Sequence, residues 1–168
     1  GVSELSFDKY LYDFVALTDV TVCPFPKNHL HEMFSKSERI NRAFYTILSR
    51  EQAMLYERIV SLGRRTALEK VAHLIIEISV RLSFLCIDID KSFKFPVRQE
   101  HIADVLGLSS IHVNRSMNEL KRHGYIDYNR STLTIIDKEK LINLANFNEM
   151  FIQKPDIKWH HEDESKAA

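Results

Sequence analysis

The chain has 168 residues and carries 23 Lys and Arg against 23 Asp and Glu, so its formal net charge is zero. This length suits one ordinary domain or two small ones and excludes a large multidomain enzyme. With 45% hydrophobic and 27% charged residues, the composition excludes a disordered protein. Because the chain has no bulk positive charge, any argument for nucleic-acid binding must rest on a local segment.

The cysteines and the apolar runs narrow the class of protein further. Cys23 and Cys86 are far apart with no CxxC pair, so we expect neither a disulfide scaffold nor a zinc module, and both thiols are expected in the core. The most apolar stretch, 71–89, is interrupted by a histidine, a glutamate and an arginine, so it is not expected to span a membrane. No signal segment opens the sequence, and we expect a cytoplasmic protein.

The N-terminal segment has the residue pattern of β-strands. Aromatic and β-branched residues in 7–15 and 20–25 flank a Thr18-Asp19 turn signal, which predicts one hairpin. Because two isolated strands are marginally stable in water, we expect them to belong to a larger sheet, most of which lies outside this sequence.

Helical patterns follow. We predict short helices over 27–34 and about 37–48, and then a long helical pattern over 49–82. In its first part, apolar and small residues recur at alternating spacings of 3 and 4, a heptad seam where two helices can approach closely. This seam is the predicted dimer interface, and it consists of Ala53, Tyr56, Val60, Gly63 and Ala67.

The apolar stripe then shifts by one residue, roughly 100° around the helix. At the shift, Thr66 and Glu69 form a capping-box pattern that marks a new helix start, and Gly63 comes just before it. We therefore predict a hinge at about 63–66, between a pairing helix and a second domain. The alternative is a single continuous helix that curves around one core.

The second domain has the element order of a winged helix-turn-helix. A strand at 93–97 precedes helices over 98–106 and 109–123, which are joined by a turn at Gly107; a hairpin over 125–136 and a helix from Asp137 to about 147 follow. Apolar residues knit the two helices together, and Ser116 stands where a further apolar residue is usual.

The second helix of this motif supplies a local positive charge. From 109 to 131 there are four Lys and Arg against two acidic residues, which leaves 4 − 2 = +2. In this architecture the start of the second helix enters the major groove, where Arg115 can bind guanine, Asn114 adenine and Ile111 a thymine methyl. Arg98, Ser109 and Arg130 suit backbone phosphates. The predicted DNA-binding residues are Arg98, Ser109, Ser110, Ile111, His112, Asn114, Arg115, Asn118 and Arg130.

Over residues 12–152 the sequence resembles the CRP/FNR regulators (the cyclic AMP receptor protein and fumarate-nitrate reduction regulator family). Segment 16–22 is similar to the end of the family's effector-domain β-roll, 57–82 to its dimerisation helix, and 106–115 to its recognition segment in a His-Val-Asn-Arg form. The resemblance implies a mainly α fold with small β elements (α+β). It divides the chain into a remnant of a cyclic-nucleotide-binding-like β-roll (1–34), helices that include the dimerisation helix (35–65), a winged helix-turn-helix domain (66–153) and a polar tail (154–168).

The resemblance implies a bacterial transcription regulator that binds a palindromic operator on double-stranded DNA as a homodimer and contacts RNA polymerase. It implies that Arg115 reads guanine and that Ser109 and His112 lie near phosphate. Ile111 stands where the best-known members carry a base-reading glutamate, so the usual TGTGA or TTGAT half-site does not follow. The family's cyclic-nucleotide cassette and iron–sulfur cysteine cluster are both missing from the sequence, so we assign no cofactor to this chain, and the effector is unknown.

Two other classes of function stay open. A metal-dependent enzyme would use His29, His31 and Glu32, or the segment 160–163, but alternating histidines on a short helix are more often surface residues. Gly-rich phosphate loops and nucleophile elbows are absent from the sequence, so we expect no catalytic residue and no metal. A winged helix used only for protein interaction would carry a neutral or acidic second helix, whereas 109–123 is basic.

Overall fold

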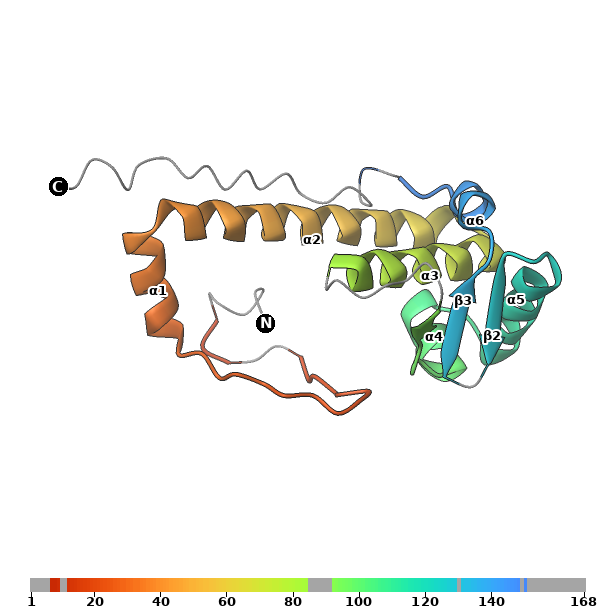
Figure 1. Cartoon of the computed structure of the whole chain (residues 1–168), viewed down its shortest axis with the longest axis horizontal. Helices are drawn as coiled ribbons and strands as arrows, with labels where there is room; N and C mark the ends of the chain where they lie inside the picture. The colour runs from red at the N-terminus through yellow and green to blue at the C-terminus, as the bar shows by residue number, and fades with distance from the viewer. Residues whose placement is uncertain (1–6, 10–11, 85–91, 130, 149, 151–168) are drawn as a thin grey trace.

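The computed structural model describes residues 7–9, 12–84, 92–129, 131–148 and 150. A long helix, α2, lies along one edge of the molecule, with α1 at its N-terminal end and a winged unit, α3 to α6 with three strands, at its C-terminal end (Figure 1). The elements are α1 Lys27–Lys36, α2 Glu38–Arg64, α3 Ala67–Phe84, β1 Phe93–Lys94, α4 Gln99–Leu106, α5 Ser110–Arg122, β2 Ile126–Asn129, β3 Thr132–Ile135 and α6 Lys138–Ala145.

Helix α2 begins at a cap and continues past the break expected near residue 48. The Ser37 hydroxyl accepts a hydrogen bond from the Ile40 amide at 3.3 Å, which satisfies one of the free N–H groups of the first turn. The helix then runs unbroken for 27 residues. The expected division into a 37–48 helix and a later one is therefore wrong, because 48–49 contains no glycine, proline or capping pair.

The break between α2 and α3 follows local capping chemistry. The Thr66 amide donates to the Glu69 carboxylate at 2.7 Å, and the Glu69 amide donates to the Thr66 hydroxyl at 3.4 Å. This reciprocal pair confirms the predicted capping box, and the alternative of one continuous helix is wrong. Motion at this break stays a prediction.

The N-terminal hairpin is not formed in the described part of the chain. Residues 7–9 and 12–26 contain no strand, and Phe14 and Val15 expose 70% and 81% of their surface. Strands need neighbouring strands or a packed face for stability, and nothing covers these side chains among the described residues. Cys23 is exposed, which corrects the expectation of a core thiol, whereas Cys86 and the predicted tail 154–168 lie outside the described residues.

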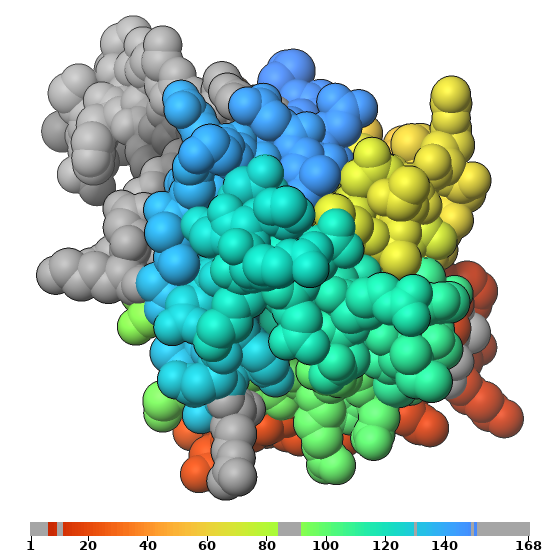
Figure 2. All heavy atoms as spheres, turned by 90° about the vertical axis from the view of Figure 1, so that its right-hand side faces the viewer, coloured from red at the N-terminus to blue at the C-terminus, as the bar shows by residue number. Residues whose placement is uncertain are grey.

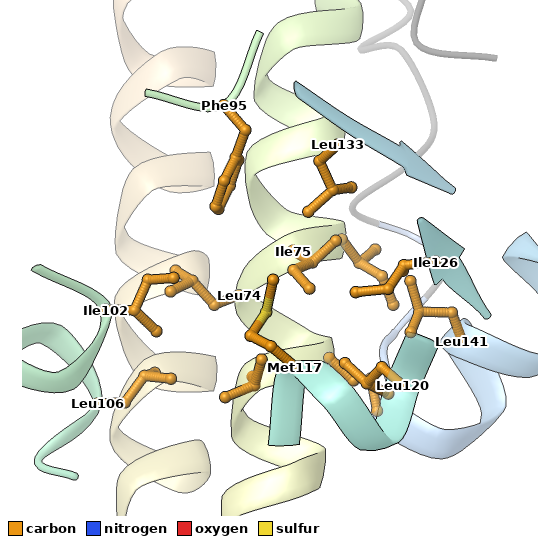
Figure 3. Packing of buried hydrophobic residues seen from close by; sticks show 14 of the residues in the cluster. Leu74, Ile75, Phe95, Ile102, Leu106, Met117, Leu120, Ile126, Leu133 and Leu141 are labelled. Atoms are coloured by element: carbon orange, nitrogen blue, oxygen red, sulfur yellow. The ribbon is translucent and has the colours of Figure 1, made fainter. Parts of the chain in front are cut away.

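The hydrophobic core lies inside the winged unit, where α3 packs against the other elements (Figure 3). Ile75 of α3, Leu120 of α5 and Leu141 of α6 are all buried, and burying each such side chain stabilises the fold by about 1.5–3 kcal/mol. The sheet is antiparallel in the order β1-β3-β2, and Leu133 of β3 lies opposite Phe93 of β1. Ser116, which departs from the apolar pattern, is also buried.

Charged side chains join α2 to the winged unit. The Arg65 guanidinium donates to the Glu57 carboxylate at 3.0 Å and to the Asn146 carbonyl at 3.1 Å. His73 of α3 is 3% exposed, and its Nε2 lies 3.6 Å from the same Glu57 carboxylate. Burial, reinforced by the neighbouring Arg65 charge, lowers the pKa of His73 to about 4, so the ring is neutral at pH 7. The Arg65 contacts therefore join the winged unit to the end of α2. The neutral His73 ring, whose Nε2 has no hydrogen-bond partner among the described residues, packs against the Phe147 ring at a centroid distance of 4.9 Å.

Candidate nucleic-acid interface

Helices α4 and α5 meet through a three-residue turn whose conformation only glycine adopts easily. Gly107 has φ +60°, in the left-handed region, and a Cβ added there meets nothing within 4 Å. Glycine is therefore favoured at this position by the left-handed backbone conformation and not by a lack of space for a side chain. The Leu108 amide donates to the Ala103 carbonyl at 2.9 Å, which closes the turn. The predicted glycine turn is confirmed.

Helix α5 starts at Ser109, whose hydroxyl accepts from the His112 amide at 3.3 Å. This bond confirms Ser109 as the N-cap and leaves the earlier amides of the first turn without helical partners. The positive end of the helix dipole at this point attracts anions. The N-terminal end of α5 is therefore suited to bind a phosphate group.

One face of α5 is buried and the opposite face is exposed, as the spacing predicts. Val113, Met117 and Leu120 pack into the core. In Figure 2, α5 lies at the centre of one face of the molecule. The structure brings together on the exposed face Ser110, Ile111, His112, Asn114, Arg115 and Asn118. Side chains of α5 also line a shallow hollow of about 540 Å³, with Arg122 at its C-terminal end.

The cations of this region differ in what they bind. Lys121 forms an ion pair with Asp127 of β2 at 2.7 Å, and this bond lowers the pKa of Asp127. Within the described part of the chain, Arg115, Arg122 and Arg98 are exposed and form no ion pair or hydrogen bond through their side chains. In this region, the arginines without such a partner thus lie on α5 and directly before α4.

The amide side chains on this face form a connected set. Asn118 Nδ2 donates to Asn114 Oδ1 at 2.9 Å, and Asn114 Nδ2 donates to Gln99 Oε1 at 3.2 Å. Gln99, the first residue of α4, was not among the predicted site residues. Its place in the sequence motif was evident, but its contact depends on how α4 and α5 cross.

The remaining predicted positions lie outside α5. Arg98 directly precedes α4, and its side chain makes no capping hydrogen bond. Arg130 lies outside the described residues. Of the predicted dimer residues, Tyr56, Val60 and Gly63 are exposed on α2, whereas Ala53 and Ala67 are half-buried.

The exposed apolar surface of α2 is wider than the predicted seam. Large apolar side chains are exposed along the second half of α2, at Leu55, Tyr56, Ile59, Val60 and Leu62. We call these residues the α2 apolar face. Several large apolar side chains exposed close together in this way are typical of an interaction surface.

The residues considered for a metal site do not form one where the structure describes them. His29, His31 and Glu32 lie on α1, and no group of three potential ligands is arranged to hold a metal among the described residues. The alternative segment 160–163 lies outside that part of the chain. None of the described helices has the length and apolarity that crossing a membrane requires.

Known proteins similar in sequence to this chain cover the helix-turn-helix that carries this site. Residues 69–144 match the family model of the Crp-like helix-turn-helix domain. A probable transcriptional activator from Rhizobium leguminosarum bv. viciae is 35% identical over 111 residues, covering 66% of this chain and 46% of that protein. The transcriptional activator protein FnrL of Cereibacter sphaeroides is 33% identical over 118 residues, covering 68% of this chain and 48% of that protein.

A third relative and a solved structure agree with these matches. The nitrogen fixation regulation protein FixK of Bradyrhizobium diazoefficiens is 32% identical over 130 residues, covering 77% of this chain and 54% of that protein. The chain thus spans about half the length of the curated relatives it matches. The structure of FixK2 from Bradyrhizobium japonicum shares the fold, with a TM-score of 0.61 at 22% identity over 70% of this chain and 58% of that one.

Proposed function

We propose, from the premise that this chain belongs to the CRP/FNR family through its Crp-like helix-turn-helix domain, that it regulates transcription by binding double-stranded DNA. The observation that carries the proposal is the exposed face of α5. It combines an uncompensated arginine, two asparagines and an open helix N-terminus on one helix of a helix-turn-helix. The proposal includes no catalytic activity, since the matched relatives are named as activators and regulators.

Each exposed residue of α5 has a role in this proposal. Helix α5 enters the major groove, where Arg115 donates two hydrogen bonds to guanine, and Ile111 contacts a thymine methyl. Asn114 hydrogen-bonds adenine. Phosphates on either side bind to Arg98, to the Ser109 end of α5 and to the predicted wing residue Arg130. The groups that supply these contacts in the described residues are exposed and, for Arg115 and Arg98, not held by internal ion pairs.

The α2 apolar face supports assembly as a homodimer. Two copies that pair along α2 would bury these side chains against each other and present two α5 helices related by twofold symmetry. Such helices contact half-sites about one helical turn apart, roughly 34 Å. A palindromic operator follows from that symmetry. The dimer would also supply the apolar burial that α2 lacks in a single chain.

The wider role follows the family. We propose that the protein is a cytoplasmic bacterial regulator, that the break at 64–67 lets an effector signal reorient the winged unit, and that the bound dimer contacts RNA polymerase. The named functions of the relatives, activation and the regulation of nitrogen fixation, are their own.

The experiment that tests the proposal is selection of bound duplexes from a random DNA pool at a fixed, stated salt concentration. We expect enrichment of a palindrome with half-sites about one helical turn apart. Salt must be fixed because phosphate contacts make affinity fall steeply with ionic strength. A pool that yields no palindrome would contradict the proposal.

A further inference from the structure

Gln99 and Asn114 link the first residue of α4 to the middle of α5 on the exposed side of the helix-turn-helix. The Asn114 amide nitrogen lies 3.2 Å from Gln99 Oε1, and Asn114 Oδ1 accepts from Asn118 at 2.9 Å. Both groups of the Asn114 carboxamide are therefore engaged before any DNA is bound. Gln99 is half-buried, whereas both asparagines are exposed.

The hydrogen bonds run in a single direction through the three carboxamides. Asn118 donates to Asn114, and Asn114 donates to Gln99. Each carboxamide has two N–H donors and an oxygen that accepts up to two hydrogen bonds. One N–H and one acceptor position on the oxygen of Asn114 therefore remain for base edges, together with one N–H and the oxygen of Asn118. At the other end of this series of hydrogen bonds, the NH₂ group of Gln99 also remains free to donate.

We propose that Gln99 is a positioning residue that sets the base preference of Asn114 without touching the base; this inference rests on the proposed DNA binding. By accepting from Nδ2, Gln99 fixes which end of the Asn114 carboxamide is nitrogen and which is oxygen. A carboxamide that can rotate offers a donor or an acceptor equally well to a base, so it discriminates less between base pairs.

The free NH₂ group of Gln99 has a partner of its own in this arrangement. The first helix of the motif crosses the DNA backbone, and Gln99 follows Arg98, which is also proposed to bind phosphate. The Gln99 NH₂ group donates to a phosphate oxygen there. Binding of the backbone thereby holds the same side chain that orients Asn114, and backbone contact and base reading are coupled through one residue.

The test compares Gln99→Ala, Gln99→Glu, Asn114→Ala and the double variant Gln99→Ala/Asn114→Ala in the full chain. Binding is measured by fluorescence anisotropy at one salt concentration, on the selected palindrome and on duplexes with single base-pair changes. Gln99→Ala should reduce discrimination about three- to tenfold, the range expected for freeing one side chain. The reduction should occur only at the base pair where Asn114→Ala also reduces it. The double variant should lose no more base discrimination than Asn114→Ala alone, although it also loses the affinity that the Gln99 phosphate contact supplies to every duplex.

Gln99→Glu separates positioning from phosphate contact. Its carboxylate still accepts from Asn114, so base preference should be kept, while affinity for every duplex should fall because the carboxylate repels phosphate. Asn143→Ala on α6 is the matched control, since it also removes an exposed amide but lies away from α5. It should change neither affinity nor preference, and circular dichroism checks that all variants fold.

Two results would overturn the inference while leaving DNA binding intact. In one, Gln99→Ala weakens all duplexes equally, which would make Gln99 a phosphate contact only. In the other, the losses of base discrimination from Gln99→Ala and Asn114→Ala add in the double variant, which would show that the two residues act independently on base preference. A wild-type chain that selects no palindrome would overturn the proposed function and this inference together.

Discussion

Arg58 of α2 donates a hydrogen bond to Glu77 of α3 at 2.5 Å, and Glu77 is almost completely buried, with 5% of its side chain exposed. Glu77 also accepts from Arg81 at 3.2 Å, and Arg81 binds both oxygens of Glu51 on α2 at 2.8 and 3.0 Å. A buried carboxylate is costly unless it is paired. The winged unit is therefore joined to α2 by a network of paired charges around a buried carboxylate.

Removing Arg58 should destabilise the protein. Arg58→Met should lower the free energy of unfolding by about 2 kcal/mol, less than a fully uncompensated buried charge because Arg81 remains beside Glu77. The measurement is urea unfolding, and the matched control is Arg42→Met, whose ion pair with Glu38 is exposed on both sides. The control should change stability by less than about 0.5 kcal/mol. Equal changes in the free energy of unfolding for the two variants would show that the buried Arg58–Glu77 pair contributes no more to stability than an exposed ion pair.

His73 should make stability depend on pH. Its pKa is lowered to about 4 in the folded chain, so below pH 6.5 the unfolded chain takes up a proton that the folded chain does not. Stability should therefore fall as pH drops from 6.5 toward 4, by about 3 kcal/mol in total.

Unfolding of His73→Leu over the same pH range isolates this contribution. The variant should lack this part of the loss at low pH, because a leucine side chain binds no proton in the folded or the unfolded state. His112→Gln removes an exposed histidine and should keep the wild-type slope. A His73→Leu variant with the wild-type slope would show that this ring does not carry the effect.

Arg115 and Arg98 should affect DNA binding differently. Arg115→Ala should cost about 1–3 kcal/mol on the selected palindrome and little on random DNA, because its proposed partner is a base. Arg98→Ala should weaken both duplexes similarly and reduce the salt slope by about 1. Affinities on both duplexes over a salt series measure these effects. Equal loss on both for Arg115→Ala would reassign it to phosphate contact.

The α2 apolar face should hold the dimer together. Val60→Glu, and Ile59→Glu beside it, should shift the chain to monomer in sedimentation, because a charge would be buried at the interface without a partner. Ile136→Glu is the matched control, since Ile136 has a similar exposure, 60%, but lies outside α2. A Val60→Glu chain that sediments as a dimer would rule out pairing through this face.

The effect of replacing Gly107 should depend on how readily the new residue adopts the left-handed backbone conformation. Gly107→Ala should lower stability by about 1 kcal/mol, the cost of a Cβ in the left-handed region. Because a Cβ there meets no neighbour, Gly107→Asn should cost less, since asparagine adopts this conformation more readily. Thermal unfolding of the two variants gives the order, and an asparagine variant less stable than the alanine one would point to a packing effect.

Features with a local cause could be predicted from the sequence. The Thr66–Glu69 capping box, the Ser109 cap and the Gly107 turn each depend on residues within a few positions, and the structure has all of them. The order of helices and strands in the winged unit follows from such signals. The exposed face of α5 was predictable too, because its buried and exposed residues alternate at helical spacing.

Features that depend on distant segments could not be predicted. The strand pattern at 7–25 has no partner strands in the described structure to complete a sheet. The heptad template missed Leu55 and Ile59, because which side of α2 stays exposed is decided by where α3 packs. The Gln99–Asn114 contact likewise depends on the crossing of two helices, and sequence spacing says nothing about it.

Because α2 is long and unbroken, a small tilt at one end produces a large displacement at the other. At 27 residues and 1.5 Å per residue, it is a rod about 40 Å long. A tilt of about 10° at the α1 end displaces the opposite end by about 7 Å, roughly two base-pair steps along a duplex. Because the Arg58–Glu77 pair ties the winged unit to α2 near that opposite end, a small angular change near α1 would displace α5, the helix proposed to read the bases, by a comparable distance as long as this pair holds.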